Sequence, residues 1–193
     1  MFDTVNGLPL HPLVVHAIVV LLPIAAIGTI VIALAPRWRR RYGWIVVAAA
    51  AVSTALIPVA TQSGEALEQR VGNPGEHAEL GGQLIWFAVP LLIMSAALMV
   101  LDWRQAATSS KVAASPSAPL ATLAANGSDN FHGSSRSTTR TTRRQGTLVK
   151  VVAGLAVVAA LATSVQIYRV GDSGAHAAWG DTPAASQHHG SDD

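Results

Sequence analysis

Four long apolar stretches alternate with polar segments along the chain. Each stretch has about 20 mostly apolar residues, the length that an α-helix needs to cross the hydrocarbon core of a bilayer. None of them contains Asp, Glu or Arg, and the single lysine lies close enough to an end to reach the headgroups. The stretches cover residues 13–35, 44–61, 82–101 and 148–168. The pattern predicts an all-α membrane protein that folds as a four-helix transmembrane bundle.

The composition supports this prediction and excludes several classes of chemistry. Of the 193 residues, 50% are hydrophobic and only 12% are charged, and the mean hydropathy is +0.38. The chain has no cysteine, which excludes disulfides, thiolate nucleophiles, iron–sulfur clusters and covalently attached haem. It also has no nucleotide-binding or hydrolase motif. We therefore expect a binding role rather than an enzymatic one.

The basic residues predict the orientation in the membrane. Of the 13 lysines and arginines, 11 lie in or beside two segments, residues 36–43 and 104–150, whereas residues 62–80 carry four glutamates. Basic loops stay on the cytoplasmic side, so both termini are expected outside the cytoplasm of a bacterial cytoplasmic membrane. Because these basic residues flank apolar spans, they indicate membrane topology, and the expected partner is the lipid bilayer rather than nucleic acid.

The chain divides into four regions. Residues 1–103 hold the first three transmembrane helices, and residues 147–180 hold the fourth with a glycine-rich close. Residues 104–146 are rich in Ala, Ser, Thr, Gly and Pro and bury too little apolar surface to order themselves, so we expect a disordered basic cytoplasmic linker. Residues 181–193 are expected to form a disordered tail.

Three prolines lie inside the spans, at Pro23, Pro58 and Pro90. Each removes a backbone donor and should kink its helix. In lipid this is tolerated where neighbouring helices satisfy the freed carbonyl groups. The sequence thus predicts helices that pack closely enough to do so.

Four histidines are predicted to lie at the same, outer edge of the membrane. They are His11 and His16 at the start of the first span, His77 before the third and His176 after the fourth. A histidine near lipid is costly without a partner or a task, so the group is a candidate functional site.

The first two histidines differ in their expected roles. His11 and His16 are five residues apart, about 140° around a helix, so they cannot face the same way. His16, roughly 6 Å below the helix start, is the expected inward-facing ligand, and His11 the expected helix-start or supporting residue. A packing role for His16, through a hydrogen bond to a carbonyl of a kinked neighbour, stays open as the alternative.

Carboxylates accompany the other two histidines. Glu76 and Glu79 flank His77, and Asp172 precedes His176 in a glycine-rich turn. Imidazole with nearby carboxylates is typical of a divalent-metal site, a haem site or a proton relay. Two glutamates at the start of a helix are equally explained by the helix dipole. The candidate metal ligands are His16, His77, Glu76, Glu79 and Asp172.

Three segments together resemble a bacterial membrane-protein family catalogued as domain of unknown function 2231. They are LHPLVVHAIVVLLP, HAELGG and VGDSGAHAAW, and the resemblance covers most of residues 8–180 outside the linker. It implies four spans but no settled activity, and it carries over His11, Pro12, His16, Pro23, His77, Gly81, Gly171, Gly174 and Ala175. One departure matters, because the family often has G-H-x-G-A where this chain has Asp172 as the second residue.

Three functional hypotheses follow. The first is a small redox protein in which His16 and His77 hold a b-type haem or a divalent metal, with an electron-transfer or membrane-complex partner. The second is a non-enzymatic membrane subunit or a pH-responsive sensor or scaffold with structural histidines. A transporter ranks last, because the only polar residues deeper in the spans are Ser53, Gln83, Ser95, Thr163 and Gln166.

Overall fold

Four helices in the described residues are long and apolar enough to span a membrane, which confirms the predicted four spans. The structure, a computed structural model, describes residues 4–5, 8–71, 75–113 and 135–179. Two short strands precede the helices, β1 (Thr4–Val5) and β2 (Leu8–Pro9), and they pair antiparallel. The sequence analysis did not predict them. The helices are α1 (Leu10–Leu34), α2 (Pro36–Val71), α3 (Glu76–Gln83), α4 (Ile85–Ala113) and α5 (Ser135–Trp179).

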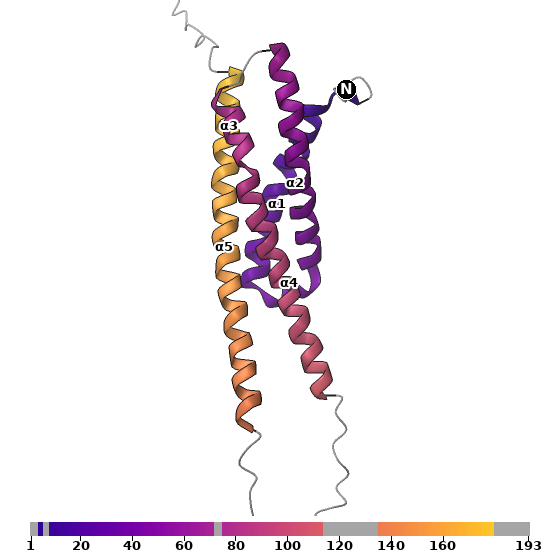
Figure 1. Ribbon diagram of the computed structural model, residues 1–193, viewed down its shortest axis with the longest axis vertical. Coiled ribbons are helices and arrows are strands. Elements are labelled where there is room, and N and C mark those ends of the chain that lie inside the picture. The colour runs from indigo at the N-terminus through magenta and orange to yellow at the C-terminus, as the bar shows by residue number, and fades with distance from the viewer. Residues whose placement is uncertain (1–3, 6–7, 72–74, 114–134, 180–193) are drawn as a thin grey trace, which may run out of the picture.

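The helices form one bundle whose long axis follows the spans (Figure 1). α1 packs against α2 and α5, and α4 packs against the same two helices from the other side. α3 and α4 form one continuous span, interrupted at Leu84, whose N–H bonds to the Gly81 carbonyl three residues back instead of four. His11, His77 and His176 lie at one end of the bundle, which we call the histidine end.

Large apolar side chains face outwards along the spans, as lipid contact requires. Val20, Ile45 and Val158 are more than half exposed, whereas the buried core holds residues such as Leu22 and Leu91. Small residues set the helix spacing. A Cβ at Gly28 would lie 2.7 Å from the Val46 side chain, so α1 and α2 approach closely there.

One proline region is contacted by a neighbouring helix, although not at the carbonyl group that the proline frees, which is that of Trp86, four residues before Pro90. The Thr163 hydroxyl of α5 donates to the Phe87 carbonyl of α4, three residues before Pro90, at 3.1 Å. Thr163 also donates to its own Ala159 carbonyl at 2.8 Å. A hydroxyl from α5 therefore reaches the α4 backbone beside the proline.

A buried guanidinium ties three helices together at the opposite end, which we call the arginine end. Arg39 is 3% exposed, and it donates from Nε to the Ile32 carbonyl at 2.7 Å and from Nη2 to the Ala33 carbonyl at 3.1 Å. Its Nη1 lies 3.8 Å from Asp102 Oδ1 of α4, and the exposed Arg40 lies 3.5 Å from the other carboxylate oxygen. Arg39 thereby joins the end of α1 to α4.

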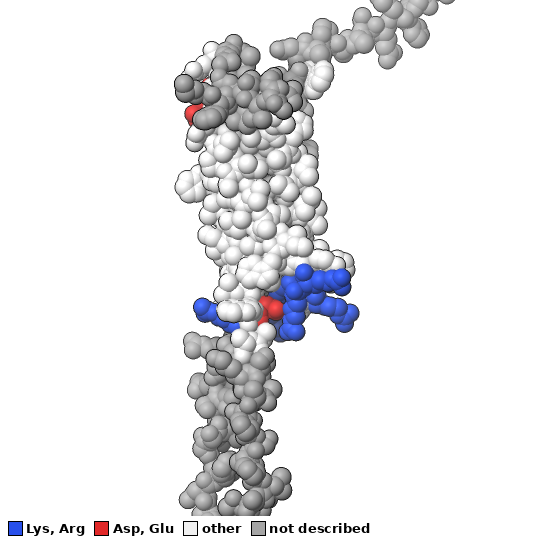
Figure 2. Space-filling view, turned by 90° about the vertical axis from the view of Figure 1, so that its right-hand side faces the viewer, with Lys and Arg blue, Asp and Glu red and all other residues white. Residues whose placement is uncertain are grey.

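Figure 2 shows Lys and Arg side chains gathered at the arginine end, below a long surface without charged side chains. The described basic residues there are Arg37, Arg39, Arg40, Arg41, Arg104 and Lys150. This distribution agrees with the charge pattern from which the orientation was predicted. Which end faces the cytoplasm stays a prediction.

The expectation of disorder over residues 104–146 does not hold at its two ends. α4 continues to Ala113, and α5 already begins at Ser135. Neither segment contains proline, and a helix that has already formed gains one hydrogen bond for each residue added, so the spans extend into polar sequence. The remaining residues, 114–134, and the tail 181–193 lie outside the described residues.

Candidate histidine site

His11 is held against α2 by two contacts. Its Nδ1 lies 3.0 Å from the Ala60 carbonyl oxygen and 3.2 Å from Ser63 Oγ. The ring packs on Gly64, where a Cβ would come within 3.1 Å of His11 Cε1. The glycine therefore makes room for the imidazole, and the carbonyl and hydroxyl fix its orientation.

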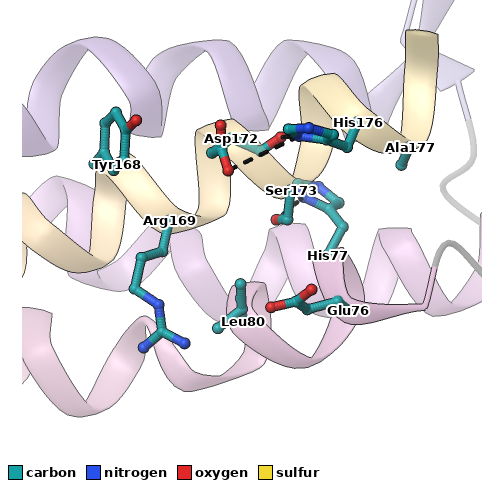
Figure 3. A pocket seen from close by; sticks show the side chains of 9 residues that line it. All are labelled: Glu76, His77, Leu80, Tyr168, Arg169, Asp172, Ser173, His176 and Ala177. Atoms are coloured by element: carbon teal, nitrogen blue, oxygen red, sulfur yellow. Dashed lines mark hydrogen bonds and ion pairs between the residues drawn. The ribbon is translucent and has the colours of Figure 1, made fainter. Parts of the chain in front are cut away.

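His77 is held against α5 in the same manner. Its Nδ1 lies 3.1 Å from the Val170 carbonyl oxygen and 3.4 Å from Ser173 Oγ. A Cβ at Gly174 would come within 3.0 Å of His77 Cε1. Figure 3 shows Ser173 beside the imidazole.

These contacts determine which ring nitrogen carries the proton. A carbonyl oxygen can only accept, and each serine hydroxyl already donates its hydrogen to that same carbonyl, at 3.0 Å for both Ser63 and Ser173. Nδ1–H is therefore the donor in both rings. In the neutral imidazole Nε2 then keeps its lone pair, and among the described residues neither Nε2 has a hydrogen-bond partner. This is the tautomer that metal-binding histidines adopt.

His11 and His77 line one cavity of about 770 Å³ at the histidine end. Its walls come from α1, α2 and α3, with Leu84 between α3 and α4 and Val170 of α5. They are mostly apolar, with Ile18 among the lining residues. Glycines in its wall leave space, since a Cβ at Gly81 would meet nothing within 4 Å. The size suits a drug-sized or cofactor-sized ligand.

Three glutamates give the cavity its charge. Glu65 and Glu68 come from α2 and Glu79 from α3, and the lining includes no lysine or arginine. Glu65 and Glu79 are exposed, and Glu68 is half-buried. The cavity is therefore rich in hydrogen-bond acceptors.

The structure places His16 away from this cavity. Its side chain is exposed, its Nδ1 donates to the Pro12 carbonyl of its own helix at 2.6 Å, and it is not part of the cavity wall. The expected inward pair of His16 and His77 is therefore not brought together, and His11 takes the inward position. The helical angle between His11 and His16 was right, but the rotation of α1 puts His11 on the buried side.

His176 also stays outside the apolar cavity. It is exposed, donates from Nδ1 to the Asp172 carbonyl at 3.0 Å and lies 3.8 Å from the Asp172 carboxylate. Both residues line a second, smaller cavity of about 470 Å³, together with Glu76, His77 and Arg169. Figure 3 shows Arg169 pointing away from the Asp172 and His176 pair.

The candidate metal ligands do not form a metal site. Within the described residues, no three His, Asp or Glu side chains come close enough to hold a metal ion. The set His16, His77, Glu76, Glu79 and Asp172 is thus spread over the exposed face of α1 and two cavities. Carboxylates beside a histidine in sequence do not guarantee convergence, because neighbouring residues of a helix point in different directions.

Comparison with known proteins identifies the family. The profile of a family described as predicted membrane protein (DUF2231) matches residues 7–128, more than half of the chain. The chain belongs to the DUF2231 family. No curated protein and no solved structure matches this DUF2231 chain. The matched part includes α1 to α4 with both cavity histidines, so the resemblance noted in the sequence is confirmed.

Four residues of the site escaped the sequence analysis as contact residues, namely Ser63, Gly64, Ser173 and Gly174. A signal was present, because a Ser-Gly pair occurs near the end of the second span and again after the fourth. Gly174 was noted only through the family resemblance. A Ser-Gly pair alone is too common to indicate a histidine partner.

Proposed function

We propose that this DUF2231 protein is a small membrane haem protein in which His11 and His77 bind a b-type haem through their Nε2 atoms. The observation that carries the proposal is the shared tautomer. Two imidazoles on different helices line one apolar cavity, and both use Nδ1–H on a main-chain carbonyl. Imidazole is a common axial haem ligand, and helix bundles build cofactor sites from facing side chains.

The donor set favours haem over a divalent metal. A metal ion held by protein alone needs three or more ligands, and the described residues do not bring three together. Haem supplies four ligands itself and needs at most two from the protein. Two histidines in a largely apolar cavity of about 770 Å³ meet that requirement.

The cellular setting follows from the predicted topology. The histidine end faces the outside of a bacterial cytoplasmic membrane, and a haem there exchanges electrons with a partner in the membrane or at its outer surface. The protein then acts as an electron carrier or as a subunit of a redox complex, and the reaction is completed by its partner.

The test is an absorption spectrum of the full chain purified in detergent from haem-sufficient cells. The wild type should show a Soret band and about one haem per chain, and His11→Ala and His77→Ala should each lose them. His16→Ala and His176→Ala are the matched controls, because both rings are exposed and bond within their own helices. A colourless wild type, or equal loss in all four variants, would overturn the proposal.

A second candidate is a scaffold or sensor subunit with structural histidines. One observation favours it: each imidazole already bridges two helices, His11 from α1 to α2 and His77 from α3 to α5. In that case His11→Ala and His77→Ala lower thermal stability in a protein that binds no haem. The spectrum and a melting curve of the same samples separate the two candidates.

A further inference from the structure

The contacts of His11 with α2 and of His77 with α5 follow the same pattern. Each histidine is the second residue of its helix, His11 in α1 and His77 in α3. Each bonds through Nδ1 to a carbonyl and to the serine three residues further on, and each packs on the next residue, a glycine. We call these two units the histidine clamps.

The sequences around the clamps correspond position by position. In α2 the clamp is Ala60-Thr61-Gln62-Ser63-Gly64, and in α5 it is Val170-Gly171-Asp172-Ser173-Gly174. In both, the serine hydroxyl donates to the carbonyl three residues before it, at 3.0 Å. A proline follows the histidine at a matching depth, Pro23 twelve residues after His11 and Pro90 thirteen after His77.

The packing of the helices has the same symmetry. The first hairpin is α1 with α2, and the second is α3 and α4 with α5, and both start and finish at the histidine end (Figure 1). α1 packs on α5 of the other hairpin as α4 packs on α2. Two hairpins of equal direction that pack reciprocally have the arrangement that a two-fold axis along the membrane normal would generate, which is a known form of internal repeat in membrane proteins.

We propose that Ser63, Gly64, Ser173 and Gly174 are positioning residues of two equivalent clamps, which offer the two Nε2 atoms as equal ligands to one occupant of the cavity. This rests on the proposed function for the identity of the occupant, but the clamps themselves do not. The Nδ1–H contacts select the tautomer, and the absence of a Cβ at each glycine sets the ring position. Both hairpins therefore contribute one ligand each, and neither is sufficient.

The glycines offer a sharp perturbation with a matched control. An Ala Cβ at Gly64 or Gly174 would lie 3.1 Å or 3.0 Å from Cε1 of the clamped ring, tighter than ordinary contact, so the ring must shift. At Gly171, one turn before Gly174 on α5, a Cβ would meet nothing within 4 Å. Alanine is the better helix former at all three positions, so loss of the fold is not the expected effect.

The first experiment needs no ligand. Imidazole ¹⁵N spectra of the detergent-solubilised full chain, at a pH where the rings are neutral, should show the Nδ1–H form for His11 and His77. Gly64→Ala should move the His11 signals only, Gly174→Ala the His77 signals only, and Gly171→Ala neither. Nε2–H forms, or signals that the first two variants leave in place, would overturn the clamps.

The second experiment measures how the clamp variants change haem retention. Gly64→Ala and Gly174→Ala should each weaken haem retention by roughly 10-fold, as loss of a supporting contact around a ligand does, and by similar factors because the clamps are equivalent. Ser63→Ala should lower haem retention, whereas Ser63→Thr, which keeps the hydroxyl, should retain haem as the wild type does. Unequal or absent effects in a pigmented wild type contradict equivalence.

The two experiments can fail separately. A protein that shows both Nδ1–H signals and the glycine effects but binds no haem refutes the proposed function and retains the clamps. A pigmented protein in which His11 and His77 are ligands but the glycine variants change nothing refutes the clamps alone.

Discussion

Arg39 offers a quantitative test of how the arginine end of the bundle is held together. In Arg39→Met the side chain keeps most of its length but loses the guanidinium. The carbonyl groups of Ile32 and Ala33 at the end of α1 then lose a charged donor, and Asp102 keeps only the exposed Arg40. Three contacts that join α1, α2 and α4 are removed at once.

The expected cost follows from burial. Removing one partner of a buried ion pair typically costs 3–5 kcal/mol, because the other charge remains without compensation. Arg40 can still reach the Asp102 carboxylate, whose side chain is 13% exposed, so the lower limit applies. We expect the free energy of unfolding to fall by about 3 kcal/mol.

Two further variants test whether burial of the Arg39 contacts is the cause of the lost stability. Arg40→Ala removes an ion pair whose arginine side chain is 71% exposed, and such pairs contribute about 0–1 kcal/mol. Arg39→Met with Asp102→Leu removes both charges and should recover most of the lost stability, since well-packed apolar pairs replace buried ion pairs at little cost.

The assay is reversible unfolding of the full chain in mixed micelles, followed by tryptophan fluorescence and helical circular dichroism. An Arg39→Met protein as stable as the wild type would refute the structural role of Arg39. If Arg40→Ala lowered the free energy of unfolding as much as Arg39→Met, the buried contacts of Arg39 would not account for the stability of this end.

Three other predictions concern the cavity and the orientation. Gly81→Leu should lower the haem content by roughly tenfold, because the leucine side chain would occupy open cavity space that a bound haem would need, and such overfilling costs about 1–3 kcal/mol. An unchanged ratio of haem to protein would contradict haem binding in this cavity. Glu68→Gln should raise the midpoint potential of a haem bound in the cavity, since a carboxylate in its wall would stabilise the ferric form, and about 1 kcal/mol corresponds to roughly 40 mV for one electron. A redox titration that shows a lower potential contradicts this sign. The chain has no cysteine, so Gly171→Cys in intact cells should react with a membrane-impermeant maleimide and Gly146→Cys should not; the reverse result inverts the predicted topology.

The spans were predictable from the sequence because bilayer thickness sets their length and composition. The choice between His11 and His16 was not predictable in the same way. Their angular separation follows from helix geometry alone, whereas the side of α1 that is buried depends on how α1 packs against α2 and α5. The sequence did not show that Gly64 of α2 leaves the space that the His11 ring occupies.

The polar ends of α4 and α5 are helical in the structure although their sequence favours disorder. Their composition is poor in large apolar residues, which favours disorder when a segment is considered alone. Both segments continue helices that the membrane spans have already nucleated, so no new nucleation cost arises. Local composition therefore underestimates order where a polar segment directly extends a stable helix.

The buried polar side chains described in the spans bond to backbone carbonyl groups. Ser53, Ser95 and Thr163 each donate to a carbonyl of their own helix, and the buried Gln166 amide donates to the Leu80 carbonyl at 3.1 Å. A proton path needs groups that can exchange partners along a chain, and these donors are engaged with backbone oxygens that cannot pass a proton on. Among the described residues, no buried side-chain donor or acceptor lacks a partner. Four of the five polar residues considered for transport are thus bonded to backbone oxygens, whereas His11 and His77 line a cavity and have no hydrogen-bond partner at Nε2 among the described residues.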